Sequence, residues 1–229
     1  MAQKLSIDVW SDIACPWCYI GKRRLEAALD RVGRDTVELR WHSFELDPTA
    51  PRESMGSHLE LISKKYGASP ADAQSMLDRV AGAAKGEGLD FHFDSSQPSN
   101  TFDAHRLLHF ANEHGKQDAL KERLFHAYFS EGARMGDKET LVRLATEVGL
   151  DAAAARAVVE SEAHALDVRR DQEEAREIGI RGVPFFVFGG RLAVSGAESA
   201  DVLEKALREA SSMKPAVFEE GATCGPDGC

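Results

Sequence analysis

Hydrophobic and polar residues alternate at the start of the chain in a way typical of a half-buried strand. Apolar side chains occupy every second position from Leu5 to Val9, and the alternation ends at Ser11-Asp12. Apolar residues then recur at helical spacing over Pro16–Val32, where a first-turn proline is well tolerated. A second alternation follows at Val37–Trp41. The opening of the chain therefore predicts a strand, a helix and a second strand.

Helical periodicity continues from about residue 55 to residue 178. One helix begins at Ser69-Pro70, a cap followed by a first-turn proline, and keeps an apolar face up to Gly86. Four shorter helices are marked by apolar positions at 104–111, 120–128, 141–148 and 158–159. A last long helix approaches Gly179. The middle of the chain is therefore predicted to be a helical block.

Strand patterns return after this block. Val183–Phe188 is a β-rich run, Gly189-Gly190 is a hairpin turn signal, and Arg191–Val194 reads as the returning strand. Glu198–Ala210 has the spacing of an amphipathic helix. From Met213 the periodicity is lost.

The order of these elements predicts an α/β fold in which one sheet is interrupted by a large helical insertion. The strand-containing halves are each too small to bury a core alone, so they are expected to pair in a single sheet. The predicted boundaries are 1–50 for the first βαβ half, 51–165 for the helical insertion, 166–212 for the second ββα half, and 213–229 for a mobile tail.

Composition and charge narrow the classes of function. No apolar run approaches the ~18 residues that a membrane span requires, so no membrane partner is expected. The formal net charge of -10 argues against binding nucleic acid, which depends on basic side chains. The first ten residues lack the apolar region of a secretory signal, which predicts a cytoplasmic protein. In a reducing compartment, close cysteine pairs are more often catalytic or metal-binding than structural.

One such pair lies in the motif Cys15-Pro16-Trp17-Cys18, at the start of the first predicted helix. The spacing brings two thiols within reach of a disulfide, and the helix N-terminus stabilises a thiolate at the first position. Cys15 is therefore expected to attack a disulfide, and Cys18 to resolve the mixed disulfide. A CxxC pair can also supply two of the four ligands of a zinc site. The preceding strand and the amphipathic helix favour redox chemistry instead.

Four stretches of the chain together resemble a known family. They are Ser11–Gly21, Phe44–Pro48, Asn100-Thr101 with Ala104-His105, and Gly179–Phe188. The chain resembles the DsbA-like branch of the thioredoxin-fold oxidoreductases, and within it the cytoplasmic FrnE-like group. The resemblance spans nearly the whole sequence and implies a thioredoxin-like fold with a helical insertion.

The resemblance also implies a substrate-binding groove. Members of the family place a cis-proline, preceded by a small or β-branched residue, opposite the CxxC motif. Val183-Pro184 matches that pattern, so its bond is expected to be cis, with the backbone of Val183 facing Cys15 and offering strand-like hydrogen bonds to a substrate. Pro16 and Trp17 are expected to line the same surface. Without the resemblance, Pro184 reads as an ordinary strand-start proline and Trp17 as a packing residue.

One position departs from the family pattern. Many thioredoxin-like proteins carry a buried acid six residues before the first cysteine, and here that position is Val9. Asp8 is expected to point to the other side of the sheet because side chains alternate along a strand. The sequence therefore assigns no proton acceptor to Cys18.

The expected function is thiol-disulfide exchange with disulfide-containing or thiol-containing polypeptides. The redox-active dithiol needs no cofactor, and glutathione or a cellular dithiol reductant is a candidate co-substrate. One alternative is a glutathione-dependent isomerase or transferase of the related kappa-like branch, whose members usually have serine at the first motif position. Another is a zinc-binding or holdase protein that uses all four cysteines. His105 and His109 share a helix face, but no third ligand accompanies them, so no metal site is predicted there.

A second cysteine pair lies in the tail sequence Cys224-Gly-Pro-Asp-Gly-Cys229. The four intervening residues are strong turn formers and allow a small disulfide ring to close. Cys224 and Cys229 are therefore expected to be a second redox-active pair that exchanges electrons with the first. The alternative is an incidental pair of exposed thiols or a weak metal clip.

Overall fold

A four-stranded mixed sheet forms the centre of the computed structural model, which describes residues 4–213. Its order is β2-β1-β3-β4, with β1 at Leu5–Ser11, β2 at Val37–Ser43, β3 at Phe185–Phe188 and β4 at Leu192–Ser195. β1 runs parallel to β2 and antiparallel to β3, and β3 and β4 form the predicted hairpin. The two halves of the chain therefore share one sheet, as the sequence predicted.

The helices of the described residues follow the predicted order with small shifts. Their bounds are α1 Pro16–Val32, α2 His58–Tyr66, α3 Pro70–Gly86, α4 Phe102–Glu113, α5 Gln117–Ser130, α6 Lys138–Glu147, α7 Ala152–Glu160, α8 Ala165–Glu177 and α9 Ala200–Ser212. The sequence did not place α2 separately, although Ser57 and Glu60 form a capping box at its start. α9 begins later than expected because Ser199 caps it by accepting a hydrogen bond from the Val202 N–H.

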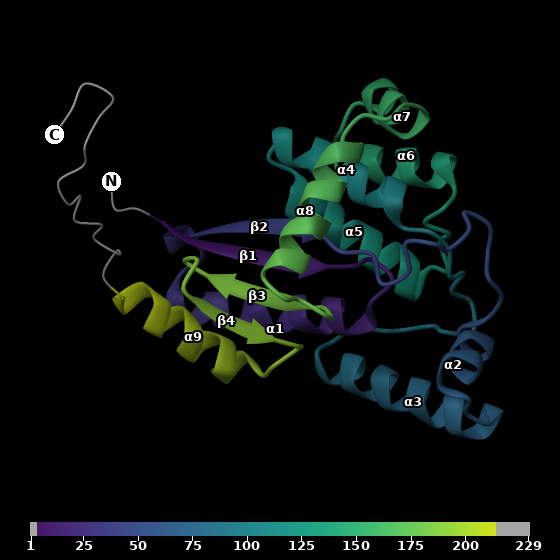
Figure 1. Cartoon of the computed structure of the whole chain (residues 1–229), viewed down its shortest axis with the longest axis horizontal. Helices are drawn as coiled ribbons and strands as arrows, with labels where there is room; N and C mark the ends of the chain where they lie inside the picture. Colours follow the sequence, from purple (N-terminus) through teal and green to yellow (C-terminus); the bar gives the residue numbers. More distant parts are fainter. Residues whose placement is uncertain (1–3, 214–229) are drawn as a thin grey trace, which may run out of the picture.

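The sheet is covered on both faces (Figure 1). α1 lies behind it in this view, α8 crosses in front of it, and α9 runs along its β4 side. The core between the sheet and the helices α1 and α9 is built from alternate strand residues and the apolar faces of the two helices. Its fully buried members include Ile7, Val9, Leu25, Phe186, Phe188 and Leu203.

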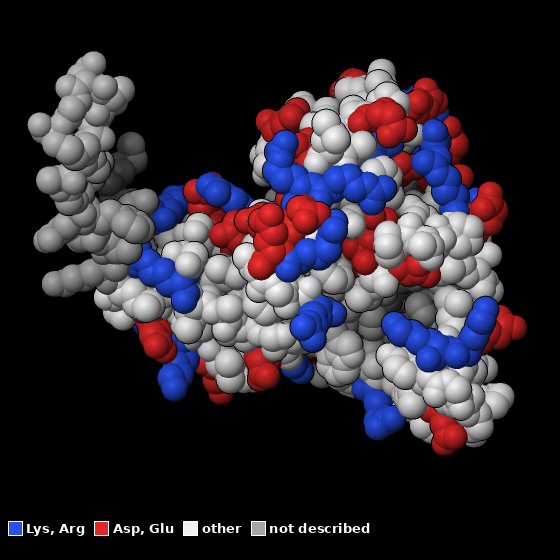
Figure 2. Space-filling model, in the orientation of Figure 1, with Lys and Arg blue, Asp and Glu red and all other residues white. Residues whose placement is uncertain are grey.

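A second and larger core lies within the helical block. It joins the first turn of α1 to α4, α5, α6 and α7, and it includes both Cys15 and Cys18. The dithiol therefore sits where the sheet half of the molecule meets the helical insertion. No helix within 4–213 is both long enough and apolar enough to cross a bilayer. Acidic and basic side chains lie next to one another over the region of α8, as expected for a solvated helix face (Figure 2).

An ion-pair cluster attaches α8 to the sheet. Both ring nitrogens of His42 on β2 contact carboxylates, at 3.0 Å from Asp171 of α8 and 3.0 Å from Asp8 of β1. Asp171 also accepts a hydrogen bond from the Ser43 N–H and contacts His109 Nε2 at 3.0 Å. Asp8 therefore points away from Val9, as strand alternation predicted.

The carboxylates decide the charge of His42. Burial alone lowers the pKa of His42, but the hydrogen bonds with Asp171 and Asp8 outweigh it and raise the pKa to about 9. Burial alone raises the pKa of Asp171, but the hydrogen bonds with His109 and His42 outweigh it and hold that pKa well below its usual range. The cluster is therefore an ionised histidine between two carboxylates at neutral pH.

This cluster predicts a pH-dependent contribution to stability. Because the pKa of His42 is higher in the folded state, its contribution is complete below about pH 6.5 and is lost as the pH rises through about 9. A rise of this size corresponds to roughly 3 kcal/mol, and the hydrogen bond with Asp171 is the largest of the favourable contributions. We expect Asp171→Asn to lower the free energy of unfolding at pH 6 by on the order of 2 kcal/mol.

Denaturant unfolding between pH 6 and pH 9.5 measures this effect. Glu174→Gln is the matched control, because that carboxylate lies 4.0 Å from His42 and is half exposed, and it should change stability little. The same slope of stability against pH in wild-type protein and Asp171→Asn would rule the assignment out.

Candidate active site

The two thiols lie at the junction between strand β1 and helix α1. Cys15 is the N-cap residue of α1, with extended backbone, and Pro16 takes the first helical position. The Cys18 N–H donates to the Cys15 carbonyl oxygen at 3.0 Å, which closes the first turn. Cys15 is 4% exposed and Cys18 is fully buried, and both are free thiols. The accessible edge of the dithiol is therefore at Cys15.

The loop before β3 faces the first thiol. The Val183-Pro184 bond is cis, as the resemblance implied. The Cys15 thiol donates to the Val183 carbonyl oxygen at 3.5 Å, so the backbone of Val183 does face the sulfur. Pro184 is buried while Val183 is half-buried. The structure thus brings together two segments that lie 168 residues apart in sequence.

A glycine makes this approach feasible. Gly21 lies on α1 one turn after Cys18, and a Cβ atom placed there would lie 3.0 Å from Pro184 Cγ and 3.2 Å from Phe186 Cζ. Any larger side chain would therefore press on the proline loop. Gly21 is part of the family-like stretch Ser11–Gly21, and this contact explains why a glycine is needed there.

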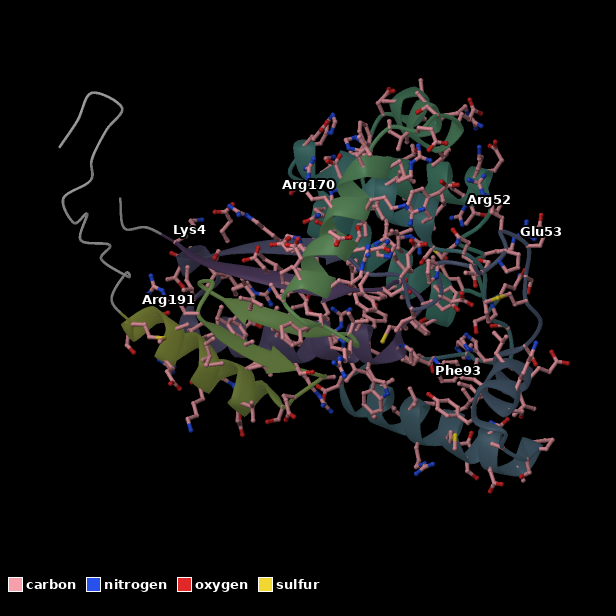
Figure 3. The ribbon with its side chains drawn as sticks, in the orientation of Figure 1. Lys4, Arg52, Glu53, Phe93, Arg170 and Arg191 are labelled. Carbon is pink, nitrogen blue, oxygen red and sulfur yellow. The ribbon has the colours of Figure 1, made fainter. Side chains whose placement is uncertain are left out.

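The surface next to Cys15 is partly apolar. Trp17 is 41% exposed and Pro16 is half-buried. Leu46, in the connection after β2, is also exposed at 44%. Farther along the same connection, Arg52 and Glu53 reach the edge of the molecule (Figure 3). Trp17 therefore exposes part of its side chain, and its role in substrate binding stays a prediction.

The carboxylate of Asp12 organises the interior side of the site. Asp12 is 2% exposed, and its oxygens accept hydrogen bonds from Thr101 Oγ1 at 2.9 Å and the Leu46 N–H at 2.8 Å. His105 Nε2 lies 3.3 Å from the same carboxylate. Burial by itself raises the pKa of Asp12, but His105 and these donors together lower it below its ordinary value. Asp12 is therefore a buried anion close to the dithiol.

A buried lysine lies close enough to both thiols to interact with their charges. Lys121 of α5 is fully buried, and its Nζ atom has no hydrogen-bond partner among residues 4–213. It lies 5.5 Å from the centre of the Trp41 ring and 5.0 Å from that of Phe125. Burial lowers the pKa of Lys121 to about 8, although the negative groups Cys18, Asp12 and Cys15 act to raise it.

The second thiol, Cys18, is held in its neutral form. Burial is the main cause that raises the pKa of Cys18 well above its ordinary value, and the hydrogen bond and charge of Cys15 add to it. The charge of Lys121 acts in the opposite direction. Cys18 therefore needs help to form the thiolate.

The predicted site residues fall into two groups. Cys15, Cys18, Val183 and Pro184 meet at one place, with Pro16 and Trp17 beside them, whereas Cys224 and Cys229 lie outside the described residues. The role of that second pair stays a prediction.

Sequence reasoning left Asp12 and Lys121 unassigned. The first strand pattern ends at Ser11-Asp12 without giving Asp12 a role, and Lys121 was not singled out within the predicted helix. Their common signal is a charged residue at a position that the apolar periodicity places in the interior.

One group of side chains that could bind a metal lies away from the dithiol. Among residues 4–213, the ligand atoms of His42, Asp171 and Glu174 all lie within 4.8 Å of one another. Both ring nitrogens of His42 already contact carboxylates, so this group is explained as the ion-pair cluster under α8. His105 and His109 contact different carboxylates, Asp12 and Asp171, and do not point to a common centre.

Comparison with known proteins gives consistent matches over nearly the whole chain. Residues 6–208 match the DSBA-like thioredoxin domain. YwbO of Bacillus subtilis (strain 168) is 32% identical over 211 residues, which cover 91% of this chain and 98% of YwbO. A probable DsbA oxidoreductase from Streptomyces coelicolor has a crystal structure with a TM-score of 0.89 and 41% identity, covering 98% of both chains.

A more distant match shares the fold alone. Cytosolic disulfide reductase DsbM from Pseudomonas aeruginosa, solved with GSH, has a TM-score of 0.64 at 17% identity, covering 91% of this chain and all of DsbM. The comparisons confirm the predicted α/β thioredoxin-like fold with added helices.

The contact between Gly21 and the proline loop predicts opposite effects of the same substitution at two glycines. Glycine to alanine in an open helix interior stabilises by roughly 0.5–1 kcal/mol. At Gly82 in α3 no atom lies within 4 Å of the point that an alanine Cβ would occupy, so Gly82→Ala should show this gain. Gly21→Ala should instead destabilise by on the order of 1 kcal/mol, because overpacking outweighs the helix propensity. Denaturant unfolding of both variants measures the difference, and a gain in stability at Gly21 would refute the tight contact.

Proposed function

The chain belongs to the family of DSBA-like thioredoxin domains, and from that premise we propose that it exchanges thiols and disulfides with protein or peptide substrates through Cys15 and Cys18. The observation that carries the proposal is the position of the Cys15 sulfur. Cys15 is the N-cap residue of α1, although its side chain makes no capping hydrogen bond, and its sulfur lies 3.5 Å from the carbonyl oxygen of Val183. A disulfide bound along Val183 would present one of its sulfurs to that thiol.

The proposed reaction has two exchange steps. The Cys15 thiolate attacks one sulfur of the substrate disulfide, a Cys15–substrate disulfide forms, and the other substrate sulfur leaves as a thiolate that takes a proton. Cys18 then loses its proton and attacks the Cys15 sulfur. The Cys15–Cys18 disulfide forms, and the second substrate sulfur leaves and is protonated. Two electrons pass from the protein dithiol to the substrate, and the reverse sequence oxidises a substrate dithiol.

The burial of the two thiols supports this division of roles. Cys15 is the thiol at the accessible edge, whereas Cys18 is fully enclosed, with its pKa raised mainly by burial. A fully enclosed thiol cannot meet a polypeptide directly, but it is one helical turn from Cys15. The exposed Trp17 and the half-buried Val183 would offer an apolar surface and backbone hydrogen-bonding groups to a strand-like substrate.

Glutathione is proposed as the small-molecule partner. A groove that binds a strand-like peptide also has the shape for a tripeptide thiol, and the related fold of DsbM has been solved with GSH. The cytoplasmic location and the FrnE-like subgroup predicted from the sequence are part of the same proposal, since glutathione is the main thiol of a reducing compartment. The presence of both cysteines favours exchange over the isomerase and transferase alternative.

The roles of the two cysteines predict an asymmetry between variants. Cys15→Ser should abolish reduction of a protein disulfide, with turnover at least a hundredfold below wild type, because the attacking sulfur is gone. Cys18→Ser should still attack and should accumulate a Cys15–substrate mixed disulfide, because only the resolving step is lost. Non-reducing peptide mass analysis identifies the trapped bond. Equal residual turnover in the two variants would contradict the assigned roles.

A further inference from the structure

A buried amine without a hydrogen-bond partner needs a reason, because enclosing an ammonium group costs several kcal/mol unless it is compensated. Lys121 is such a group. It is fully enclosed, and no described residue accepts a hydrogen bond from its Nζ atom. Its other buried counterpart, Lys22, instead contacts three carboxylates, those of Glu26, Asp118 and Glu122.

The contacts of Lys121 place its amine in the core that contains the dithiol. Nζ lies 5.0 Å from the centre of the Phe125 ring, which stacks at 4.9 Å on the ring of Tyr19, the residue after Cys18. On its other side it lies 5.5 Å from the centre of the Trp41 ring. Both rings stabilise a cation through their faces without fixing it as a hydrogen bond would.

The charged and titratable groups around this amine come from each neighbouring element. Cys15, Cys18 and Lys22 belong to α1 or its N-cap, and Asp12 precedes that helix. His105 of α4 contacts Asp12, and its Nδ1 atom has no partner among residues 4–213. The negative groups that act most strongly on the Lys121 amine are therefore Cys18, Asp12 and Cys15.

We propose that Lys121 is the charge-compensating residue of the dithiol, whose ammonium group balances the Cys18 thiolate when that thiolate attacks the Cys15–substrate disulfide. The inference deepens the proposed exchange reaction and rests on it. During this step the Cys18 proton passes to solvent, the Cys18–Cys15 bond forms, and the substrate sulfur leaves as a thiolate that is protonated. Without Lys121 the new negative charge would face Asp12 in a low-dielectric interior.

The electrostatics of the site agree with this role. Burial and Cys15 raise the pKa of Cys18, and Lys121 is the first group that lowers it. Conversely, Cys18 is the first group that supports the charged form of Lys121 against burial, which lowers its pKa to about 8. The position occupied by a buried acid in many thioredoxin-like proteins is Val9, which is fully buried in the sheet core and carries no charge.

The test measures the titration of Cys18 in the full chain without any substrate. In a background with Cys15→Ala, Cys224→Ser and Cys229→Ser, Cys18 is the only thiol, and its thiolate absorbance is followed against pH. Lys121→Met removes the charge at similar volume, and Lys121→Gln removes it while keeping a polar end. Both should lower the thiolate fraction at a given pH about tenfold, because an opposite charge in close range changes the equilibrium by at least that factor.

Lys116→Met is the matched control. Lys116 precedes α5, and its Nζ atom donates to the carbonyl oxygens of Val148 and Gly149, away from the dithiol. The same substitution there should leave the Cys18 titration unchanged. Thermal unfolding distinguishes this role from a purely structural one. Removing a buried amine that has no hydrogen-bond partner should leave the midpoint of Lys121→Met equal to or above that of wild type. If Lys121 were needed for the fold, the same substitution would lower the midpoint.

Single-turnover kinetics with a peptide disulfide complete the test in the protein that retains both active-site cysteines. Lys121→Met should form the Cys15–peptide disulfide at the wild-type rate and resolve it about tenfold more slowly at pH 7. A Cys18 titration that is identical with and without Lys121 overturns the proposal even if exchange occurs. Failure of the wild-type protein to exchange with any disulfide would overturn the proposed function instead, and the substrate-free titration would still decide the role of Lys121.

Discussion

The buried carboxylate of Asp12 holds the site together. A charge enclosed to this degree must be satisfied by donors, and here the donors come from the connection after β2 and from the start of α4. Leu46, Thr101 and His105 are each far from Asp12 in sequence, yet all of them are tied to the residue three positions before Cys15. Three of the four stretches that carried the family resemblance therefore meet around this one anion, whereas the fourth, Gly179–Phe188, contacts Cys15.

Helix α1 belongs to two cores at once. Its first turn, with both thiols, packs in the helical block, while Leu25, Ala28 and Leu29 pack against the sheet. Gly21 lies between these parts and allows Pro184 to contact the helix directly. Because the loop before β3 is held on α1 and the sheet, the carbonyl oxygen of Val183 stays within reach of the Cys15 sulfur. The large helical insertion is thus part of the active-site wall and encloses Cys18.

Buried charges occur in two different surroundings in this structure. On the α8 side of the sheet, His42 lies between Asp8 and Asp171, each charge has a close partner, and the result is stability. Next to the dithiol, Lys121 has rings around it and no hydrogen-bond partner among residues 4–213. An amine that is not bound by a carboxylate remains free to respond to a charge that appears during a reaction. The same residue chemistry therefore serves structure in one place and reactivity in the other.

The sequence by itself determined the local features: the strand, helix and strand order, the hairpin at Gly189-Gly190, and the location of Cys15 at a helix start. These follow from periodicity and turn chemistry, which act over a few residues. The approach of Val183 to Cys15 was available only through resemblance. Tertiary structure alone decided that Asp12 and Lys121 lie near the dithiol and that His42 pairs with Asp171. A local pattern marks a position as interior, but which distant charges share that interior depends on how the helical block packs on the sheet.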